Sequence, residues 1–283
     1  MEIKKVGVVG CGLMGSGIAQ VCAQSGYQVV VSEINNELLN KGLASINSFL
    51  TKSVDKGRIS QQDKEATLGR IKGTTNTQDF HDCDLIVEGA IENMDLKKKI
   101  FAELDKICPK HTILATNTSC LSIIDMAMVT TRPDKVLGLH FFNPPPIMKL
   151  LEIVRTIVTS DETLKIGNDF AKSLGKTTVI AQDTPGYIVN RLLIPYLLNT
   201  IRLLEAGVAT REDIDTAINL GLNHPMGPLT LLDLVGLDTT LFIANAMYEE
   251  LKEPQYAPPT LLKKMVTAGW LGRKTGKGFY EYK

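Results

Sequence analysis

The stretch Val6–Gln20, VGVVGCGLMGSGIAQ, decides the fold of this chain. An apolar run is followed by Gly10-Cys11-Gly12-Leu13-Met14-Gly15 and then by a helical pattern over Leu13–Ser25. G-x-G-x-x-G alone is a weak signal, but between a strand and a helix it is typical of a dinucleotide-binding loop. Gly10 permits the tight turn, Gly12 lets a pyrophosphate approach, and Gly15 allows close packing of helix and strand. We therefore expect Gly10, Gly12, Leu13, Met14 and Gly15 to contact a dinucleotide at the helix N-terminus.

The nucleotide type is indicated by Glu33, which follows the expected strand Gln28–Ser32. A carboxylate at this place accepts hydrogen bonds from the adenosine ribose and repels a 2′-phosphate. No Arg or Lys follows at once, since the next residues are Ile34-Asn35-Asn36. The sequence therefore predicts NAD, with NADP the less favoured cofactor.

Short apolar runs alternate with helical patterns up to about residue 180. Further strands are expected at Leu85–Val87, Ile113–Thr116, Val136–His140, Leu150–Val154 and Thr177–Ile180. Such alternation predicts an α/β Rossmann-type doubly wound sheet. Residues 36–70 are polar and helical, which predicts a helical hairpin that turns near Lys56–Ser60 and projects from the sheet.

The strand signals stop after Asp183-Thr184-Pro185-Gly186. Tyr187–Glu205 is expected to be a long helix that is apolar on more than one face, as in a core or an interface. Thr210 and Asp213 resemble a capping box that opens the next helix. We therefore expect a dinucleotide-binding domain at 1–185 and an all-α C-terminal domain at 186–283.

Composition excludes several classes of function. Lys+Arg and Asp+Glu are equal at 31 each, so charge gives no reason to expect nucleic acid or a membrane surface as partner. There is no apolar run of about 18 residues and no signal-peptide pattern, so a cytoplasmic protein is expected. Five cysteines without a C-x-x-C pair and four scattered histidines predict neither disulfides nor a metal site.

A candidate acid–base pair lies in "KVLGLHFFNPPPIMKLLEIVRT", residues 135–156. His140 ends one apolar run, and Glu152 lies in the next, beyond a proline-rich turn. If the two runs pair antiparallel, the carboxylate returns beside the imidazole and fixes its tautomer, as in a general base for an alcohol. Asn117 and Ser119 follow another strand and are expected at the same edge, close to the cofactor. Spacing alone leaves open a second interpretation, in which His140 and Glu152 only satisfy strand ends.

Motifs along the whole chain resemble the 3-hydroxyacyl-CoA dehydrogenase family. They are GCGLMGSGIAQ at 10–20, TNTS at 116–119, GLHFFNP at 138–144, MKLLE at 148–152, DTPGYIVNR at 183–191, NHPMGP at 223–228, DLVGLD at 233–238 and KTGKGFY at 274–280. The resemblance implies an NAD-dependent enzyme that interconverts a short-chain (S)-3-hydroxyacyl-CoA, such as 3-hydroxybutyryl-CoA, and its 3-keto form. It also implies a homodimer formed through the C-terminal domain.

The resemblance also implies roles for single residues. His140 corresponds to the catalytic base and Glu152 to its partner, while Ser119 and Asn190 correspond to residues that hold the 3-oxygen of the substrate. Implied cofactor contacts are Glu92, Lys97, Asn143 at the nicotinamide and, as a weaker match, Lys274. On the helical hairpin, Lys52 and Lys56 correspond to residues that meet the CoA phosphates. Two departures from the commoner family pattern are Cys11, where Gly or Ala is usual, and Glu33, where Asp is frequent.

Several of these residues, and the chain as a whole, also fit other interpretations. Ser119 is also placed to cap a helix near Leu121, and Lys52 and Lys56, spaced i,i+4, also fit a solvated helix face. A related dehydrogenase of a free hydroxy acid or sugar acid would share the glycine loop and the histidine. A nucleotide-binding protein without catalysis would share only the loop, and it would not need the dyad.

Overall fold

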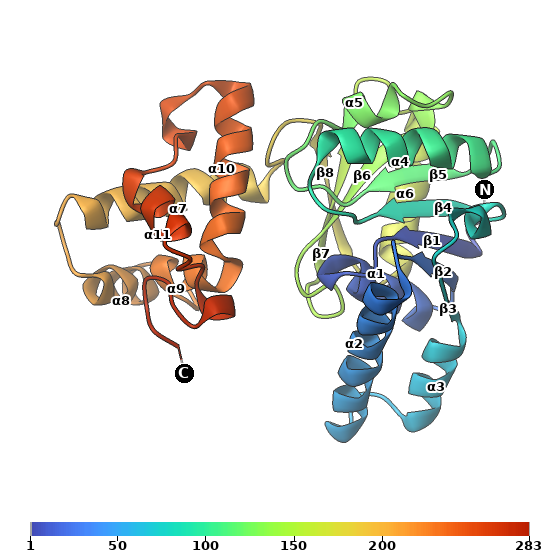
Figure 1. The fold of residues 1–283 in the computed structure, drawn as a ribbon, viewed down its shortest axis with the longest axis horizontal. Helices are drawn as coiled ribbons and strands as arrows, with labels where there is room; N and C mark the ends of the chain where they lie inside the picture. Colours follow the sequence, from blue (N-terminus) through green and yellow to red (C-terminus); the bar gives the residue numbers. More distant parts are fainter. Residues whose placement is uncertain (1, 283) are drawn as a thin grey trace. The chain divides into compact units, whose positions relative to one another are not determined.

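The computed structural model describes residues 2–282 of the chain and divides into two compact units, Met1–Asp183 and Thr184–Lys283 (Figure 1). The first unit is built on one eight-stranded sheet with the order β3-β2-β1-β4-β5-β6-β7-β8. Its strands are β1 Lys5–Val9, β2 Gln28–Ser32, β3 Ile71–Thr74, β4 Leu85–Glu88, β5 Ile113–Thr116, β6 Val136–Phe141, β7 Leu150–Arg155 and β8 Thr177–Gln182. Neighbouring strands are parallel except β6 and β7, which pair antiparallel. The strand order reverses at β1 and β4, the switch point where such sheets bind nucleotides.

The central strands are apolar because they are buried. Every residue of β4, β5 and β6 is buried. Parallel strands covered on both faces have near-continuous apolar sequences, and LIVE, ILAT and VLGLHF have that form. Their polar residues lie at or near the carboxyl ends, as Glu88, Thr116 and His140 do. The sheet therefore presents its polar groups at the edge where a ligand is expected.

Helices α5 Ile123–Ala127 and α6 Asp161–Ser173 pack on opposite faces of β6. A Cβ on Gly138 would lie 2.6 Å from Cδ1 of Ile123 in α5, and a Cβ on Gly167 in α6 would lie 3.2 Å from Leu137. Leu137 and Gly138 are consecutive in a strand, so they face opposite sides. Close packing therefore requires glycine at position 138, on one face, and favours glycine at position 167, on the other. Helix α1 Leu13–Gln24 covers β1 and β2, and α4 Met94–Ile107 follows β4.

Residues 36–70 hold two helices that pack together and extend away from the sheet (Figure 1). Helix α2 spans Asn36–Asp55, with Asn35 as its N-cap, and α3 spans Gln61–Gly69, with a capping box made by Ser60 and Asp63. Strand β3, which follows α3, was not among the strands expected from the sequence. It has four residues at the edge of the sheet, and only one of them is fully buried, so its apolar signal is weak.

The second unit is helical. Its α-helices are α7 Val189–Glu205, α8 Arg211–Gly221, α9 Pro228–Val235, α10 Leu237–Leu251 and α11 Thr260–Thr267. Thr210 caps α8 by accepting a hydrogen bond from the Asp213 N–H, as its sequence predicts. Asp233 of α9 holds the chain end, because its carboxylate accepts hydrogen bonds of 2.9 Å from the N–H groups of Phe279 and Tyr280.

Residues 2–282 contain no single helix that is long and apolar enough to cross a membrane. Among the described helices, the pair α9 and α10 reaches that length and composition when taken together, and the two are bent by 93° at their junction.

Candidate active site

The glycine-rich loop joins β1 to α1 at the switch point of the sheet. Gly10 adopts φ +90°, a conformation that L side chains rarely adopt, and a Cβ on Gly15 would lie 1.9 Å from the Gly10 carbonyl oxygen. Around Gly12 the space is open, because no heavy atom other than those of Gly12 and its neighbours in the chain lies within 4 Å of the position a Cβ would take. Because no side chain caps α1 at Gly12, the helix N-terminus is available to phosphate oxygens. The loop thus fits a dinucleotide pyrophosphate.

Glu33 lies beside this loop, directly after β2. Its Oε2 accepts a hydrogen bond from the Cys11 N–H at 2.9 Å, and its Oε1 accepts one from the Ile34 N–H at 2.8 Å. The hollow between the loop and α2 has a volume of about 360 Å³ and is lined by Glu33 and Lys41 among others. Two backbone donors therefore orient the carboxylate before any ribose binds.

Strands β6 and β7 pair antiparallel and bring His140 opposite Glu152, which is the condition on which the expected acid–base pair depends. Nδ1 of His140 lies 2.6 Å from Oε2 of Glu152, and the two residues are 4% and 0% exposed. Nε2 of His140 lies 3.2 Å from Oγ of Ser119. With Nδ1–H donating to the carboxylate, Nε2 is the nitrogen that accepts a proton. The arrangement is that of an oriented general base with a hydroxyl group at its reactive nitrogen.

Asn117 lies at the same edge and links two strands. Its side-chain oxygen accepts a hydrogen bond of 2.8 Å from the Phe141 N–H, and its own N–H donates to the Glu88 carbonyl at 2.7 Å. The side chain therefore ties the end of β5 to the end of β6. Its contact with the cofactor stays a prediction.

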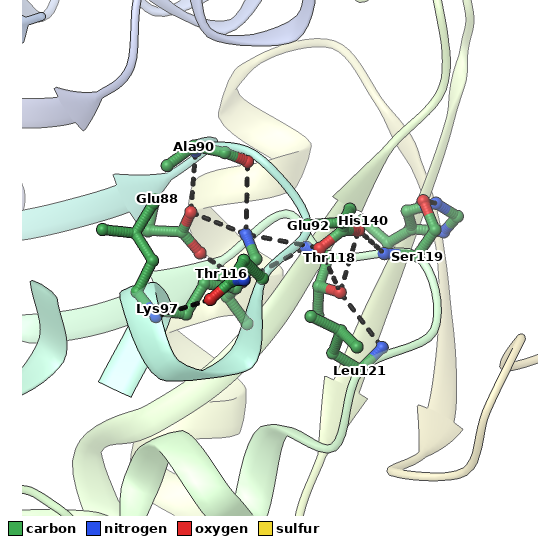
Figure 2. Close-up of polar contacts among 11 residues, drawn as sticks. Glu88, Ala90, Glu92, Lys97, Thr116, Thr118, Ser119, Leu121 and His140 are labelled. Atoms are coloured by element: carbon green, nitrogen blue, oxygen red, sulfur yellow. Dashed lines mark hydrogen bonds and ion pairs between the residues drawn. The ribbon is translucent and has the colours of Figure 1, made fainter. Parts of the chain in front are cut away.

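Glu92 and Lys97 form part of a polar network that reaches Ser119 (Figure 2). Glu92 accepts a hydrogen bond from the Ser119 N–H at 2.9 Å. Lys97 is 1% exposed and is paired with Glu88. Sequence reasoning missed Glu88 and Thr118 in this network. A charged residue that ends an apolar strand is the signal that points to Glu88.

The remaining expected contacts lie on other elements. Asn143 is exposed in the turn after β6, and Lys52 and Lys56 are exposed towards the C-terminal end of α2. Asn190 is the second residue of α7, and Lys274 lies on the 3-10 helix η4 Arg273–Thr275, where its Nζ is 2.5 Å from Oδ1 of Asp238. Asn190 and Lys274 belong to the second unit. Within residues 2–282 no group of three His, Cys, Asp or Glu side chains is arranged to hold a metal ion.

This site fits a dehydrogenase, because its glycine loop can hold a dinucleotide and its buried His–Glu pair can take a proton from an alcohol. The family model of the 3-hydroxyacyl-CoA dehydrogenase NAD-binding domain matches residues 5–184, and that of its C-terminal domain matches residues 186–282. The chain belongs to this family.

Similar proteins cover the chain from end to end. The 3-hydroxybutyryl-CoA dehydrogenase of Mycobacterium tuberculosis is 48% identical over 282 residues, 99% of each chain. The mitochondrial hydroxyacyl-coenzyme A dehydrogenase of Sus scrofa is 47% identical over 289 residues, which cover 99% of this chain and 92% of that protein. The crystal structure of (S)-3-hydroxybutyryl-CoA dehydrogenase from Ralstonia eutropha has a TM-score of 0.96 and 44% identity, with 100% of both chains covered.

Proposed function

We propose that this protein interconverts (S)-3-hydroxybutyryl-CoA and acetoacetyl-CoA with NAD as its cofactor. The observation that carries the proposal is the His140–Glu152 pair, 2.6 Å apart and set at the same sheet edge as the glycine loop. Relatives of the same length that carry the name 3-hydroxybutyryl-CoA dehydrogenase support the choice of substrate. Bound nicotinamide supplies the acceptor or donor of the hydride.

His140 is the general base in the oxidative direction. Its Nε2 takes the proton of the 3-hydroxyl while the hydride leaves C3, and Glu152 stabilises the imidazolium through Nδ1. Ser119 Oγ, 3.2 Å from Nε2, is placed to hydrogen-bond the same oxygen of the substrate. In the reductive direction the same nitrogen returns the proton to the forming alkoxide.

We assign Asn190 as a second hydrogen-bonding partner of the 3-oxygen, and residues 186–283 as the domain of substrate binding and dimerisation. Several large apolar side chains of this unit support an interface, since Leu192, Leu220 and Leu222 are 72%, 81% and 60% exposed. Light scattering on the purified protein tests the dimer. Asn190→Ala should lower kcat with (S)-3-hydroxybutyryl-CoA and with acetoacetyl-CoA, and it should leave the oligomeric state unchanged.

Glu33 selects NAD over NADP in this proposal. Its carboxylate is already oriented by the Cys11 and Ile34 N–H groups, so it meets the adenosine ribose as an acceptor and a 2′-phosphate as a like charge. Glu92, Asn117, Asn143, Lys97 and Lys274 remain proposed cofactor contacts. For Lys97 and Lys274 the existing ion pairs favour an indirect contribution to the cofactor site.

Lys52 and Lys56 are proposed to bind the phosphates of CoA. Changing both to Gln should raise KM for acetoacetyl-CoA by roughly 2- to 30-fold with kcat unchanged, because exposed ion pairs contribute about 0.2 to 1 kcal/mol each. Acetoacetyl-pantetheine, which lacks the nucleotide phosphates, should show no change in KM. Lys106→Gln, at an exposed position of α4, is the control. An equal rise in KM for both thioesters would show that these lysines do not bind the CoA phosphates.

The deciding experiment follows the absorbance of NADH. The protein is mixed with acetoacetyl-CoA and NADH, then with NADPH in place of NADH, then with free acetoacetate in place of the thioester. Oxidation of NADH at ordinary enzyme rates, about 1 to 1000 per second, with the thioester alone supports the proposal. Turnover of the free acid without turnover of the thioester would instead establish a hydroxy-acid dehydrogenase.

A further inference from the structure

A buried ion pair lies outside the catalytic dyad, where β4 ends and α4 begins. Nζ of Lys97 is 2.7 Å from Oε1 of Glu88, and the two side chains are 1% and 0% exposed. The Glu88 carboxylate has two more donors, the Ala90 N–H on Oε1 and the Thr116 hydroxyl on Oε2, each at 2.7 Å (Figure 2). Groups from β4, the loop after it, α4 and β5 therefore meet at the Glu88 carboxylate, and their contacts fix its position.

The place of Lys97 is unfavourable for a cation. Lys97 lies in the first turn of α4, where the helix dipole favours negative charge, and its ammonium is removed from water. A buried ion pair gives little net stability, since the cost of desolvation offsets the attraction between the charges. The pair is therefore better explained by the geometry that it imposes than by the stability that it adds.

Lys97 connects this pair to a second carboxylate. Its Nζ lies 3.4 Å from Oε2 of Glu92, which belongs to the loop between β4 and α4. Glu92 accepts hydrogen bonds from the Ser119 N–H at 2.9 Å and from the Thr118 hydroxyl at 2.9 and 3.0 Å. Thr118 Oγ1 in turn accepts the Leu121 N–H at 3.1 Å. Glu92 thus fastens the loop after β5 to the loop after β4.

Ser119 connects this series of contacts to the catalytic dyad. Its N–H is bound to Glu92, and its Oγ lies 3.2 Å from Nε2 of His140. We propose that Glu88 is a positioning residue that acts through Lys97 and Glu92 on the backbone of Ser119, and so sets the Ser119 hydroxyl at the reactive nitrogen of His140. This inference rests on the proposed function, in which that hydroxyl holds the 3-oxygen of the substrate.

The effect of neutralising Glu88 follows from the contacts. In Glu88→Gln the amide keeps the size of the side chain, but Lys97 is left with Glu92 as its carboxylate partner among these residues. The ammonium then draws Glu92 closer than the present 3.4 Å and away from the Ser119 N–H. Displacing a reacting group by about 1 Å can cost on the order of 100-fold in rate. We therefore expect kcat to fall by roughly 10- to 100-fold.

The test is a double-mutant cycle with Ser119→Ala, read as kcat for acetoacetyl-CoA and NADH. If Glu88 acts through Ser119, Glu88→Gln lowers kcat in the wild-type background and has little further effect once the serine hydroxyl is absent. An equal fold-loss of kcat in both backgrounds would overturn the proposal. Asp105→Asn is the matched control, because Asp105 also lies on α4 and forms a buried ion pair, with Arg132, that does not join this network. It should lower the melting temperature and leave kcat near the wild-type value.

A second pair of variants keeps the proposal testable if Glu88→Gln does not fold. Thr118→Val removes the hydroxyl that binds Glu92 and should lower kcat only while Ser119 is present, and Thr118→Ser should restore it. Loss of kcat in Thr118→Val that persists in the Ser119→Ala background would contradict the proposal. Wild-type turnover of acetoacetyl-CoA is measured in the same series, so failure of the proposed function would be seen in the wild-type protein itself.

Discussion

His140 faces Glu152 directly across the antiparallel pair β6–β7, and their side chains meet at 2.6 Å. The relationship depends on a single reversal of direction in an otherwise parallel sheet. Had β7 run parallel to β6, a crossover of a dozen or more residues would have been needed, and the 12-residue spacing leaves no room for it. The proline-rich turn between the strands therefore helps to place the carboxylate.

Replacing Glu152 by Gln is expected to lower kcat on the order of 1000- to 10,000-fold, with a small change in KM. The amide keeps the packing but no longer compensates the charge of the imidazolium, and it can hold the ring in the wrong tautomer, as in comparable triads. Steady-state kinetics with acetoacetyl-CoA and NADH measure the loss. Glu162→Gln, at an exposed position of α6, is the control. Near-normal kcat in Glu152→Gln would show that the pair has only a structural role.

Replacing Glu33 by Gln is expected to raise the NADPH to NADH ratio of kcat/KM by roughly tenfold, equivalent to about 1.4 kcal/mol. The amide oxygen can still accept the Cys11 N–H, so the loop keeps its shape while the repulsion of a 2′-phosphate is lost. Glu37→Gln, in the first turn of α2, should leave the ratio unchanged. If the NADPH to NADH ratio is unchanged in Glu33→Gln, another residue of the hollow selects the nucleotide.

The stability of the protein should depend on the charge of Asp105, because its loss would leave the buried Arg132 without a compensating charge. Burial by itself would raise the pKa of Asp105, but hydrogen bonds from the Thr131 N–H and from Arg132 outweigh it and hold the pKa below the usual 3.8. A carboxyl whose pKa is lowered in the folded state stabilises the protein above its unfolded pKa, and the contribution is lost as the pH falls through the folded value.

Asp105→Asn should therefore lower the free energy of unfolding by about 3 to 5 kcal/mol near pH 7, since one partner of a buried pair is removed. The difference from wild type should shrink as the pH falls below the ordinary pKa of 3.8. Urea unfolding at a series of pH values measures it, with Asp134→Asn, at an exposed position, as the control. A difference that stays constant with pH would contradict the ionic origin of the effect.

Much of the fold could be predicted because its signals are local. Seven of the eight strands carry apolar runs, and the glycine loop requires a strand before it and a helix after it. Strand β3 escaped prediction because an edge strand is half exposed, and IKGT contains a lysine and a glycine. Local propensity says little about such a strand, whose pairing with β2 is set by the rest of the sheet.

In the candidate site, too, some contacts could be predicted from the sequence and others could not. The His140–Glu152 pair could be inferred because two adjacent strands and one turn determine it. The contacts of Glu88 with Lys97, and of Glu92 with Ser119, could not. Glu88 and Lys97 are nine residues apart across a loop, and Glu92 and Ser119 are 27 apart on different loops. No periodicity encodes such distances, because the path of each loop decides them.

The five cysteines are expected to be unreactive in the folded protein. All are buried, and burial raises the pKa of Cys11, helped by the nearby Glu33 charge, to about 11. Burial likewise raises the pKa of each of the other four thiols, Cys22, Cys83, Cys108 and Cys120, to about 12. Because the thiolate is the reacting species, an aromatic disulfide reagent at pH near 8 should modify none of them rapidly.

Unfolding in guanidinium should release all five thiols at once, which the same reagent counts by absorbance. Cys11 gives the sharpest test, because it lies in the dinucleotide loop and its contact with Glu33 uses the backbone N–H. Cys11→Ala keeps that N–H and should leave KM for NADH within about twofold of wild type, since the substitution removes no contact that binds the cofactor. Rapid modification of Cys11 in the native enzyme, or a large rise in KM for NADH in Cys11→Ala, would show that the thiol itself takes part in cofactor binding.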